Sequence, residues 1–165
     1  MSKLAFIFPG QGAQKAGMGK DFYENSEAAR SFFDQAQKIL DFDLKEMCFG
    51  EHEELNLTEY TQPCMVSVCL AIVQELKKRG INPDITAGLS LGEYAAVAAA
   101  GGMNELDAIK LVRRRGILMQ STVPAGEGAM AAVLGLDAKK IEEILESFEN
   151  VWIANYNCPG QIVIT

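Results

Sequence analysis

Two short apolar runs stand out from the mixed sequence around them. The first covers residues 3–8 and is closed by Pro9 and Gly10, and the second leads directly into Gly88. Uninterrupted apolar runs of this length are typical of strands that are buried on both faces of a parallel sheet. The pattern therefore predicts a first strand over residues 3–8 and another strand just before Gly88.

Elsewhere in the first 120 residues, apolar side chains recur at the spacing of an amphipathic helix. We expect Pro63 near the first position of one helix and basic residues 77–79 at its end, where cations favour the helix dipole. The acidic stretch 41–57 lacks this spacing and is predicted to be irregular. The predicted helices cover residues 21–40, 61–79, 91–100 and 105–120, with Asn104 as the cap of the last.

A glycine- and proline-containing stretch, residues 123–128, is the strongest boundary signal in the chain. Beyond it, the pattern predicts strands over residues 129–134, 151–156 and 161–165, and a helix that Asp137 caps and Phe148 ends. The earlier strands and crossover helices indicate an α/β architecture for residues 1–125. The later β-α-β-β order indicates that residues 126–165 begin a small α+β subdomain.

The composition narrows the class of protein. The 165 residues carry a formal net charge of −7, and the isoelectric point is about 4.8. This acidic balance argues against a general nucleic-acid surface, and no apolar run is long enough for a signal peptide or a membrane span. With four cysteines, no C-x-x-C pair and one histidine, we expect no metal site, no cofactor, and buried free thiols in a cytoplasmic protein.

Gly88, Ser90 and Gly92 form a G-x-S-x-G pattern between a predicted strand and an Ala-rich helix. In this setting the pattern is typical of a nucleophile elbow, a strained turn that exposes the serine Oγ. The glycines let strand and helix approach closely, and the helix that starts at Leu91 aims its N–H groups at an oxyanion formed by attack of Ser90. The alternative is a glycine-rich loop with a serine cap, which the surrounding strand and helix make the weaker interpretation.

Two glutamines are further candidates for this site. Gln11 lies between two glycines in a loop that leaves the carboxyl end of the first strand, where ligands bind in open α/β sheets. A flexible crossover loop is the alternative interpretation of this segment. Gln62 precedes an apolar helix and either points into a cleft or belongs to the polar surface.

The arginine cluster and the single histidine are the remaining candidates for the site at the elbow. Three consecutive arginines at positions 113–115 span most of a helical turn, so they cannot share one face, and at least one can point toward the elbow. We expect Arg113 and Arg114 to be solvated. His52 lies among glutamates, and this neighbourhood favours a solvated side chain over a catalytic base.

Five motifs, in this order and spacing, resemble those of the malonyl-CoA:acyl carrier protein transacylase family. The motifs are Phe8-Pro9-Gly10-Gln11-Gly12, Gly88-Leu89-Ser90-Leu91-Gly92-Glu93-Tyr94, Arg115-Gly116 with Met119-Gln120, residues 124–130, and Asn155-Tyr156-Asn157-Cys158-Pro159-Gly160-Gln161. The resemblance runs from the first strand to the last residue. It implies an α/β-hydrolase-like parallel sheet with an inserted ferredoxin-like α+β subdomain, both incomplete in this chain.

The resemblance also implies a reaction in fatty-acid biosynthesis. Members of the family move a malonyl group from malonyl-CoA to the phosphopantetheine thiol of acyl carrier protein. By resemblance, Ser90 matches the nucleophile, and Gln11 and Leu91 match the residues whose backbone N–H groups form the oxyanion hole. Arg115 matches the arginine that holds the malonyl carboxylate, and Gln62 falls where the family has a glutamine that lines the cleft.

The chain departs from the family pattern in two places. Leu89 stands where many members have a histidine before the nucleophile. The catalytic histidine of the family lies in a downstream segment that this chain does not contain. The base is then expected from a continuation or from a second chain that carries the C-terminal half. Two other interpretations stay open, namely a catalytically silent fragment that binds CoA or acyl carrier protein, and a serine thioesterase or hydrolase.

Overall fold

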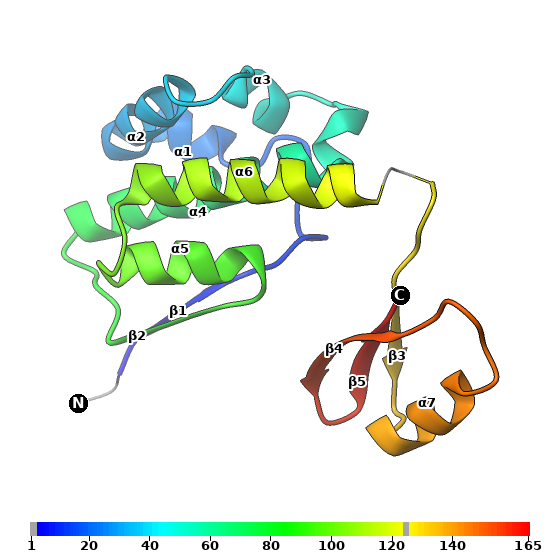
Figure 1. The fold of residues 1–165 in the computed structure, drawn as a ribbon. Helices are drawn as coiled ribbons and strands as arrows, with labels where there is room; N and C mark the ends of the chain where they lie inside the picture. The colour runs from blue at the N-terminus through cyan, green and yellow to red at the C-terminus, as the bar shows by residue number, and fades with distance from the viewer. Residues whose placement is uncertain (1–2, 124–125) are drawn as a thin grey trace. The chain divides into compact units, whose positions relative to one another are not determined.

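A computed structural model describes residues 3–123 and 126–165, a mixed α/β chain with two small sheets (Figure 1). The chain divides into two compact units, Met1–Thr122 and Val123–Thr165. Pro124 and Ala125, which belong to the predicted boundary stretch, lie outside the described residues.

The first unit contains a parallel pair of strands, β1 (Ala5–Phe8) and β2 (Ile85–Gly88), as the two apolar runs predict. The register pairs Phe8 with Gly88, and at the other end Asp84 and Leu4 exchange hydrogen bonds of 2.8 Å in both directions. Because the strands are parallel and in register, the loops after Phe8 and Gly88 leave the same end of the sheet.

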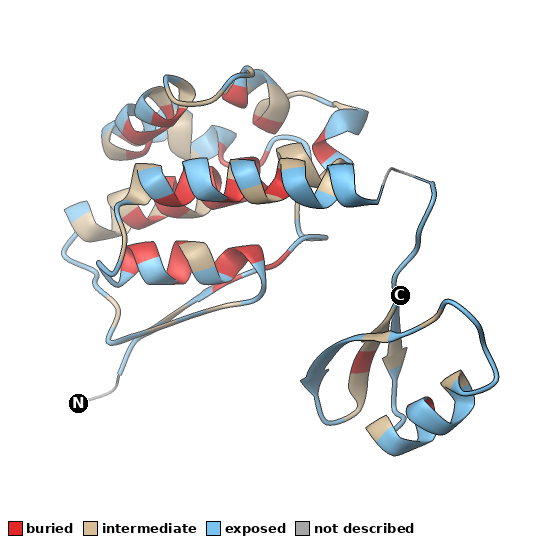
Figure 2. Cartoon of the chain, viewed as in Figure 1, coloured by how far each residue is buried: buried red, intermediate tan, exposed pale blue. Residues whose placement is uncertain are grey.

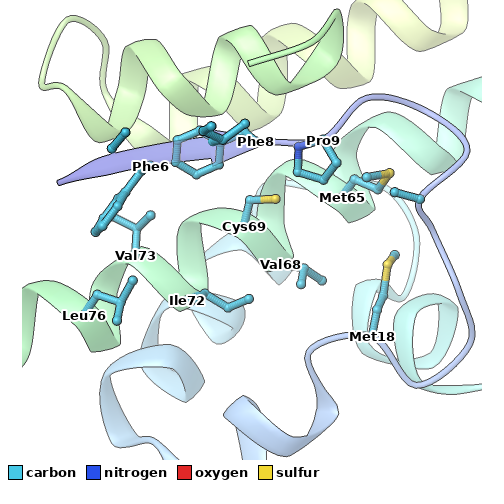
Figure 3. Close-up of a pocket in the computed structure, with 13 residues that line it drawn as sticks. Phe6, Phe8, Pro9, Met18, Met65, Val68, Cys69, Ile72, Val73 and Leu76 are labelled. Atoms are coloured by element: carbon cyan, nitrogen blue, oxygen red, sulfur yellow. The ribbon is translucent and has the colours of Figure 1, made fainter. Parts of the chain in front are cut away.

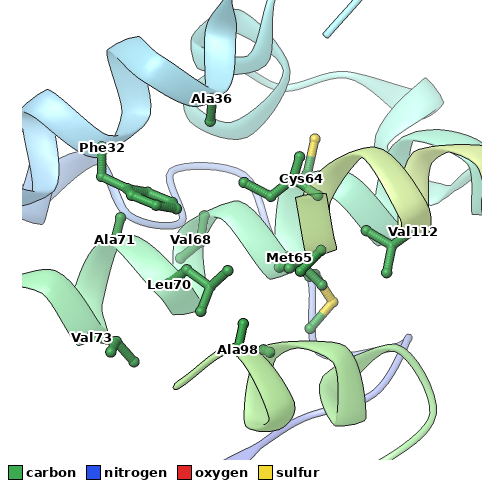
Figure 4. Close-up of a cluster of buried hydrophobic side chains, with 14 of the residues drawn as sticks. Phe32, Ala36, Cys64, Met65, Val68, Leu70, Ala71, Val73, Ala98 and Val112 are labelled. Atoms are coloured by element: carbon green, nitrogen blue, oxygen red, sulfur yellow. The ribbon is translucent and has the colours of Figure 1, made fainter. Parts of the chain in front are cut away.

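Helices account for most of this unit, and α4 lies at its centre. Its side chains pack against α2, α5 and α6, and Phe32, Leu70, Ala98 and Val112 mark the shared apolar core (Figure 4). The red positions of α4 and α5 in Figure 2 are the faces that this core buries. The helices are α1 (Lys20–Asn25), α2 (Glu27–Gln37), α3 (Leu44–Phe49), the 3-10 helix η1 (Glu53–Asn56), α4 (Thr58–Lys78), α5 (Leu91–Ala99) and α6 (Glu105–Thr122).

The single helix predicted over residues 21–40 is wrong, because the chain breaks at Ser26. Ser26 has an extended backbone (φ −125°, ψ 118°), and its Oγ accepts from the Ala29 N–H at 3.0 Å as the cap of α2. The same hydroxyl donates to Glu75 of α4 at 2.5 Å. The stretch 41–57 is also more regular than predicted, since Asp43 caps α3 by accepting from the Glu46 N–H.

Pro63 does not stand near the first position of its helix, because α4 begins at Thr58. An interior proline leaves the carbonyl four residues earlier without its helical donor. That carbonyl belongs to Glu59, and Arg113 of α6 donates to it through Nη1 at 2.8 Å. The side chain of Arg113 therefore replaces the hydrogen bond that Pro63 cannot make.

The expectation that Arg113 is solvated is wrong for the same reason. Its side chain is 12% exposed, donates to both carboxylate oxygens of Asp41 at 2.9 and 3.0 Å, and lies near the rings of Phe42 and Tyr60. The bound guanidinium lowers the pKa of the Asp41 carboxyl. Arg114, in contrast, is exposed as expected.

The basic residues at the end of α4 are paired with carboxylates. Lys77 binds Glu105, Lys78 binds Glu27, and Arg79 binds Glu75 within its own helix. Ion pairs and the helix dipole thus account for this basic cluster.

One face of the β1–β2 sheet is uncovered in the first unit. Ile7 is 78% exposed and Ile85 is 53% exposed, although strands of parallel sheets are usually covered on both faces. Within the described residues, β1 pairs with β2 alone, so its second edge carries no strand. An apolar groove of about 430 Å³ follows this edge and is floored by α4, where Met65, Val68 and Ile72 line it together with Phe6 (Figure 3).

The second unit is a small antiparallel sheet with one helix. Its elements are β3 (Ala131–Leu134), α7 (Ala138–Leu145), β4 (Ile153–Cys158) and β5 (Gln161–Ile164), and the strand order is β3-β5-β4. Asp137 caps α7 as predicted, by accepting from the Lys140 N–H at 2.9 Å. Over residues 126–165, Ile141 and Ile162 are the buried apolar side chains, so this part of the chain has a small core.

The remaining expectations concern thiols, metals and membranes. Cys48 and Cys64 are buried and Cys69 is half-buried, but Cys158 is exposed, so the prediction of buried thiols is wrong for that residue. Burial raises the pKa of the Cys69 thiol to about 11. Over residues 3–123 and 126–165, no three His, Cys, Asp or Glu side chains gather as metal ligands would, and none of the helices is both long and apolar enough to cross a membrane.

Candidate active site

The turn between β2 and α5 holds Ser90 in a strained backbone conformation. Ser90 has φ 54° and ψ −113°, a region that non-glycine residues rarely adopt, and the residue is exposed. A Cβ built on Gly88 would overlap the backbone of Gly92 and Glu93, and one built on Gly92 would overlap the carbonyl oxygen of Phe8. The two glycines therefore allow the close contact that forces the sharp turn.

This contact gives a first testable prediction, for Gly88→Ala. Alanine is at least as favourable as glycine in a strand, so any loss of stability comes from the steric overlap. We expect the free energy of unfolding to fall by about 3 kcal/mol, at the upper end of overpacking costs. Urea unfolding measures this loss, with Gly102→Ala as the matched control because its added Cβ would meet only Val97 atoms, the nearest at 3.1 Å. Equal midpoints for Gly88→Ala and the wild type would contradict the prediction.

The Arg115 guanidinium from α6 reaches the serine. Its Nη2 donates to Ser90 Oγ at 3.2 Å, and its Nη1 donates to Gln62 Oε1 at 2.6 Å. The structure therefore brings together three candidates that lie far apart in the sequence. Arg115 has further N–H groups that no described residue accepts, and a positive charge of this kind beside an exposed hydroxyl is suited to bind an anionic group there.

Gln62 holds the arginine from a fully buried position on α4, with 0% relative exposure. Its Nε2 donates to Met119 Sδ at 3.3 Å, which fixes the amide so that Oε1 faces Arg115. On the other side, the guanidinium carbon of Arg115 lies 5.8 Å from the ring centre of Tyr94, within cation–π range. Gln62 is therefore neither a surface residue nor an isolated cleft residue, because it orients the guanidinium.

The loop after β1 approaches the same turn. The Leu89 N–H donates to the Phe8 carbonyl at 3.1 Å, which ties the Gln11 loop to the elbow. Leu91 is buried at the start of α5. Within the described residues, the backbone N–H groups of Gln11 and Leu91 find no acceptor, so both can donate to a bound anion.

His52 belongs to another part of the first unit. It is half-buried beside η1, and its Nε2 lies 3.0 Å from Glu46 Oε1. Among the residues that the structure describes, no hydrogen bond joins His52 to Ser90 or Arg115. The geometry therefore gives His52 no role as the base for Ser90.

Sequence reasoning missed four residues that shape this site. Tyr94 lies against Arg115 and Met119 accepts from Gln62, while Thr58 accepts from the Gln11 side chain and donates its backbone N–H to Gln120. Tyr94, Met119 and Gln120 belong to the motifs quoted above, but no pattern assigned them a contact, and Thr58 lies in a stretch that was predicted to precede its helix. For Met119, the signal that could have found the contact is spacing on a helix. Met119 lies four positions after Arg115, and residues four apart on a helix are neighbours on one face.

Most of the chain matches one family model. The acyl transferase domain family matches residues 5–165. The malonyl CoA-acyl carrier protein transacylase of Bacillus subtilis (strain 168) is 49% identical over 170 aligned residues, which cover 100% of this chain and 54% of that protein.

Solved structures give the same relation in three dimensions. The malonyl CoA-acyl carrier protein transacylase of Clostridium perfringens ATCC 13124 superposes with a TM-score of 0.88 at 45% identity, over 99% of this chain and 53% of that one. A malonyl-transacylase solved in complex with a type II PKS acyl-carrier protein superposes with a TM-score of 0.86 at 40% identity, over 99% of this chain and 54% of that one. The chain thus spans about half the length of these relatives.

Proposed function

Because this chain belongs to the acyl transferase domain family, we propose that it carries the nucleophile of a malonyl-CoA:acyl carrier protein transacylase of fatty-acid synthesis. The observation that supports this most directly is the contact of Arg115 Nη2 with Ser90 Oγ at 3.2 Å. A substrate must then present an anionic group and an electrophilic carbon only a few bonds apart. In malonyl-CoA, one methylene separates the carboxylate from the thioester carbonyl, so one molecule can place its carboxylate at Arg115 and its carbonyl carbon at Ser90.

The proposed reaction has two transfers through an ester. Ser90 Oγ attacks the thioester carbonyl, its proton passes to a general base, and the oxyanion accepts from the Gln11 and Leu91 N–H groups. Collapse breaks the carbon–sulfur bond, and coenzyme A leaves as the thiol with that proton. The phosphopantetheine thiol of acyl carrier protein then attacks the malonyl ester, and Ser90 regains its proton as the malonyl thioester forms.

The finer description of the fold belongs to the same proposal. We assign residues 1–125 to an α/β-hydrolase-like large subdomain and residues 126–165 to the start of a ferredoxin-like small subdomain. The parallel β1–β2 pair with its crossover helix α4 supports the first assignment, and the β3-α7-β4-β5 order supports the second. Three cysteines that are at least half-buried and free support a reducing, cytoplasmic setting.

The partner that completes the first unit is the segment that the relatives have beyond the matched half. The open edge of β1 offers unpaired backbone groups, and the apolar groove beside it offers about 430 Å³ next to Phe6 and Ile72. A parallel strand from that segment would pair with β1 and place apolar side chains in the groove. The general base, which His52 does not supply, would come from the same segment.

The function and this partner are tested in one experiment. The chain is expressed alone and together with the unmatched C-terminal half of the Bacillus subtilis relative as a second polypeptide. We expect the two polypeptides to copurify, the amides of Ala5–Phe8 to exchange hydrogen more slowly, and the intact mass to gain one malonyl group only in the assembly. Holo-acyl carrier protein should then remove this group.

Two variants provide the controls. Ile7→Asp places a charge on the uncovered sheet face and should prevent copurification. Leu111→Glu, on an exposed position of α6 outside the groove, should not. Failure to associate would refute the proposed partner, whereas association without a malonyl ester would refute the proposed reaction in favour of a silent binding module. Rapid release of free malonate without carrier protein would instead indicate a thioesterase.

A further inference from the structure

Thr58 is the point where the Gln11 loop, α4 and α6 are joined. Its Oγ1 accepts from Gln11 Nε2 at 3.1 Å, and its backbone N–H donates to Gln120 Oε1 at 3.1 Å. The cap residue of α4 is Leu57, whose side chain cannot accept a hydrogen bond. Gln120 therefore supplies the acceptor that the first turn of α4 lacks and holds Thr58 in place from the neighbouring helix.

The same contact between α4 and α6 holds the arginine. A Cβ on Gly116 would lie 2.8 Å from Glu59 Cα and 2.8 Å from the Thr58 carbonyl oxygen, so only glycine permits this close approach. Arg115 and Met119, on either side of Gly116 along α6, both contact Gln62 of α4. One helix contact thus sets the positions of the guanidinium and of the anchor for the Gln11 loop.

A second set of hydrogen bonds holds the Gln11 loop. The Gly12 N–H donates to Gln14 Oε1 at 2.7 Å, and Gln14 Nε2 donates to Asn56 Oδ1 at 3.1 Å. The Gln14 contact occupies the Gly12 N–H and the Thr58 contact occupies the Gln11 side chain, while no described residue accepts from the Gln11 backbone N–H. Its direction is set by the two anchors, because the loop has no regular secondary structure of its own.

We infer that Thr58 is a positioning residue that fixes the Gln11 backbone N–H toward the oxyanion of the reaction, with Gln120 holding Thr58. This inference rests on the proposed function. Among the described residues, no hydrogen bond joins Thr58 to Ser90, and Thr58 acts through the Gln11 side chain. Because the oxyanion exists in the transition state and not in the bound substrate, loss of this positioning lowers the rate of the chemical step and leaves substrate binding unchanged.

Thr58→Val tests the inference, since valine keeps the branched shape and the backbone N–H but removes the acceptor. In the catalytically complete assembly, we expect the rate constant for Ser90 acylation at saturating malonyl-CoA to fall by about tenfold, with KM changed less than about twofold. Gln11→Ala removes the other partner and should give a similar loss. Because both variants break the same contact, the double variant should be no slower than either single one.

Thr122→Val is the matched control, because the Thr122 hydroxyl donates to the Leu118 carbonyl of its own helix at 2.7 Å and lies outside this network. It should leave the acylation rate unchanged. Multiplicative losses in the double variant, or a rise in KM at constant kcat, would overturn the inference.

Hydrogen exchange on the chain alone gives a readout that needs no activity. Thr58→Val should speed exchange of the Gly12 amide, whose N–H is bonded to Gln14, by about tenfold, as expected when one restraint on the loop is lost. The amide of Leu89, which is bonded to the Phe8 carbonyl, should be unchanged. Unchanged exchange at Gly12 would refute the positioning role. If the wild-type assembly forms no ester, the proposed function fails, while this exchange measurement still decides the role of Thr58.

Discussion

Ser90→Ala is expected to abolish the malonyl ester, with a loss of at least about a thousandfold in the rate of acylation. No other hydroxyl among the described residues hydrogen-bonds to Arg115, so none is placed to take over the attack. Intact mass after incubation of the assembly with malonyl-CoA measures the effect. Ser121→Ala is the matched control, because the Ser121 hydroxyl only donates to the Leu118 carbonyl within α6.

The backbone of Ser90 adds a second readout to this prediction. At φ 54° and ψ −113° a side chain is strained, and alanine carries the same Cβ as serine. Ser90→Gly removes that Cβ and should raise the free energy of unfolding by about 1 kcal/mol while it also abolishes the ester. If Ser90 merely capped α5, both substitutions would instead lower the free energy of unfolding. Retention of the ester in Ser90→Ala would show that the nucleophile lies elsewhere.

The strained serine explains why the central motif could be predicted from the sequence. Gly88, Ser90 and Gly92 are separated by single residues, so the residues that the sharp turn requires all lie within five consecutive positions of the sequence. Asn104 and Asp137 could be predicted as caps for the same reason, since each accepts from N–H groups two or three residues later. Local geometry of this kind needs no knowledge of the rest of the fold.

The errors arise where a distant residue changes the local outcome. A proline within a helix is normally disfavoured, so the pattern placed the start of α4 near Pro63, but Arg113 supplies the lost donor from 54 residues away. Ser26 interrupts a continuous helical pattern because Glu75 of α4 accepts a hydrogen bond from its hydroxyl. The partners of Gln62 and Thr58 likewise come from α6, so their orientation could not be read from their own neighbours.

The choice between acyl groups should depend on Arg115. Its guanidinium can bind a carboxylate through two charge-assisted hydrogen bonds, and a neutral acetyl group offers no such acceptor. We expect Arg115→Ala to lower kcat/KM for malonyl-CoA by about 10²- to 10³-fold, which corresponds to about 3–4 kcal/mol, and to change kcat/KM for acetyl-CoA by less than about threefold. Arg114→Ala, one residue earlier and exposed, should alter neither value.

Gln62→Glu tests the same preference for malonyl over acetyl, because Gln62 accepts a hydrogen bond from the Arg115 guanidinium. Gln62 Oε1 already accepts from Arg115 Nη1 at 2.6 Å, so a carboxylate at this buried position would form an internal ion pair. That pair would neutralise the charge that we propose attracts the malonyl carboxylate and would compete for its donors. We therefore expect Gln62→Glu to lower malonyl transfer at least about tenfold more than acetyl transfer. Equal losses for both thioesters in Arg115→Ala and Gln62→Glu would mean that the arginine supports the elbow and does not select the acyl group.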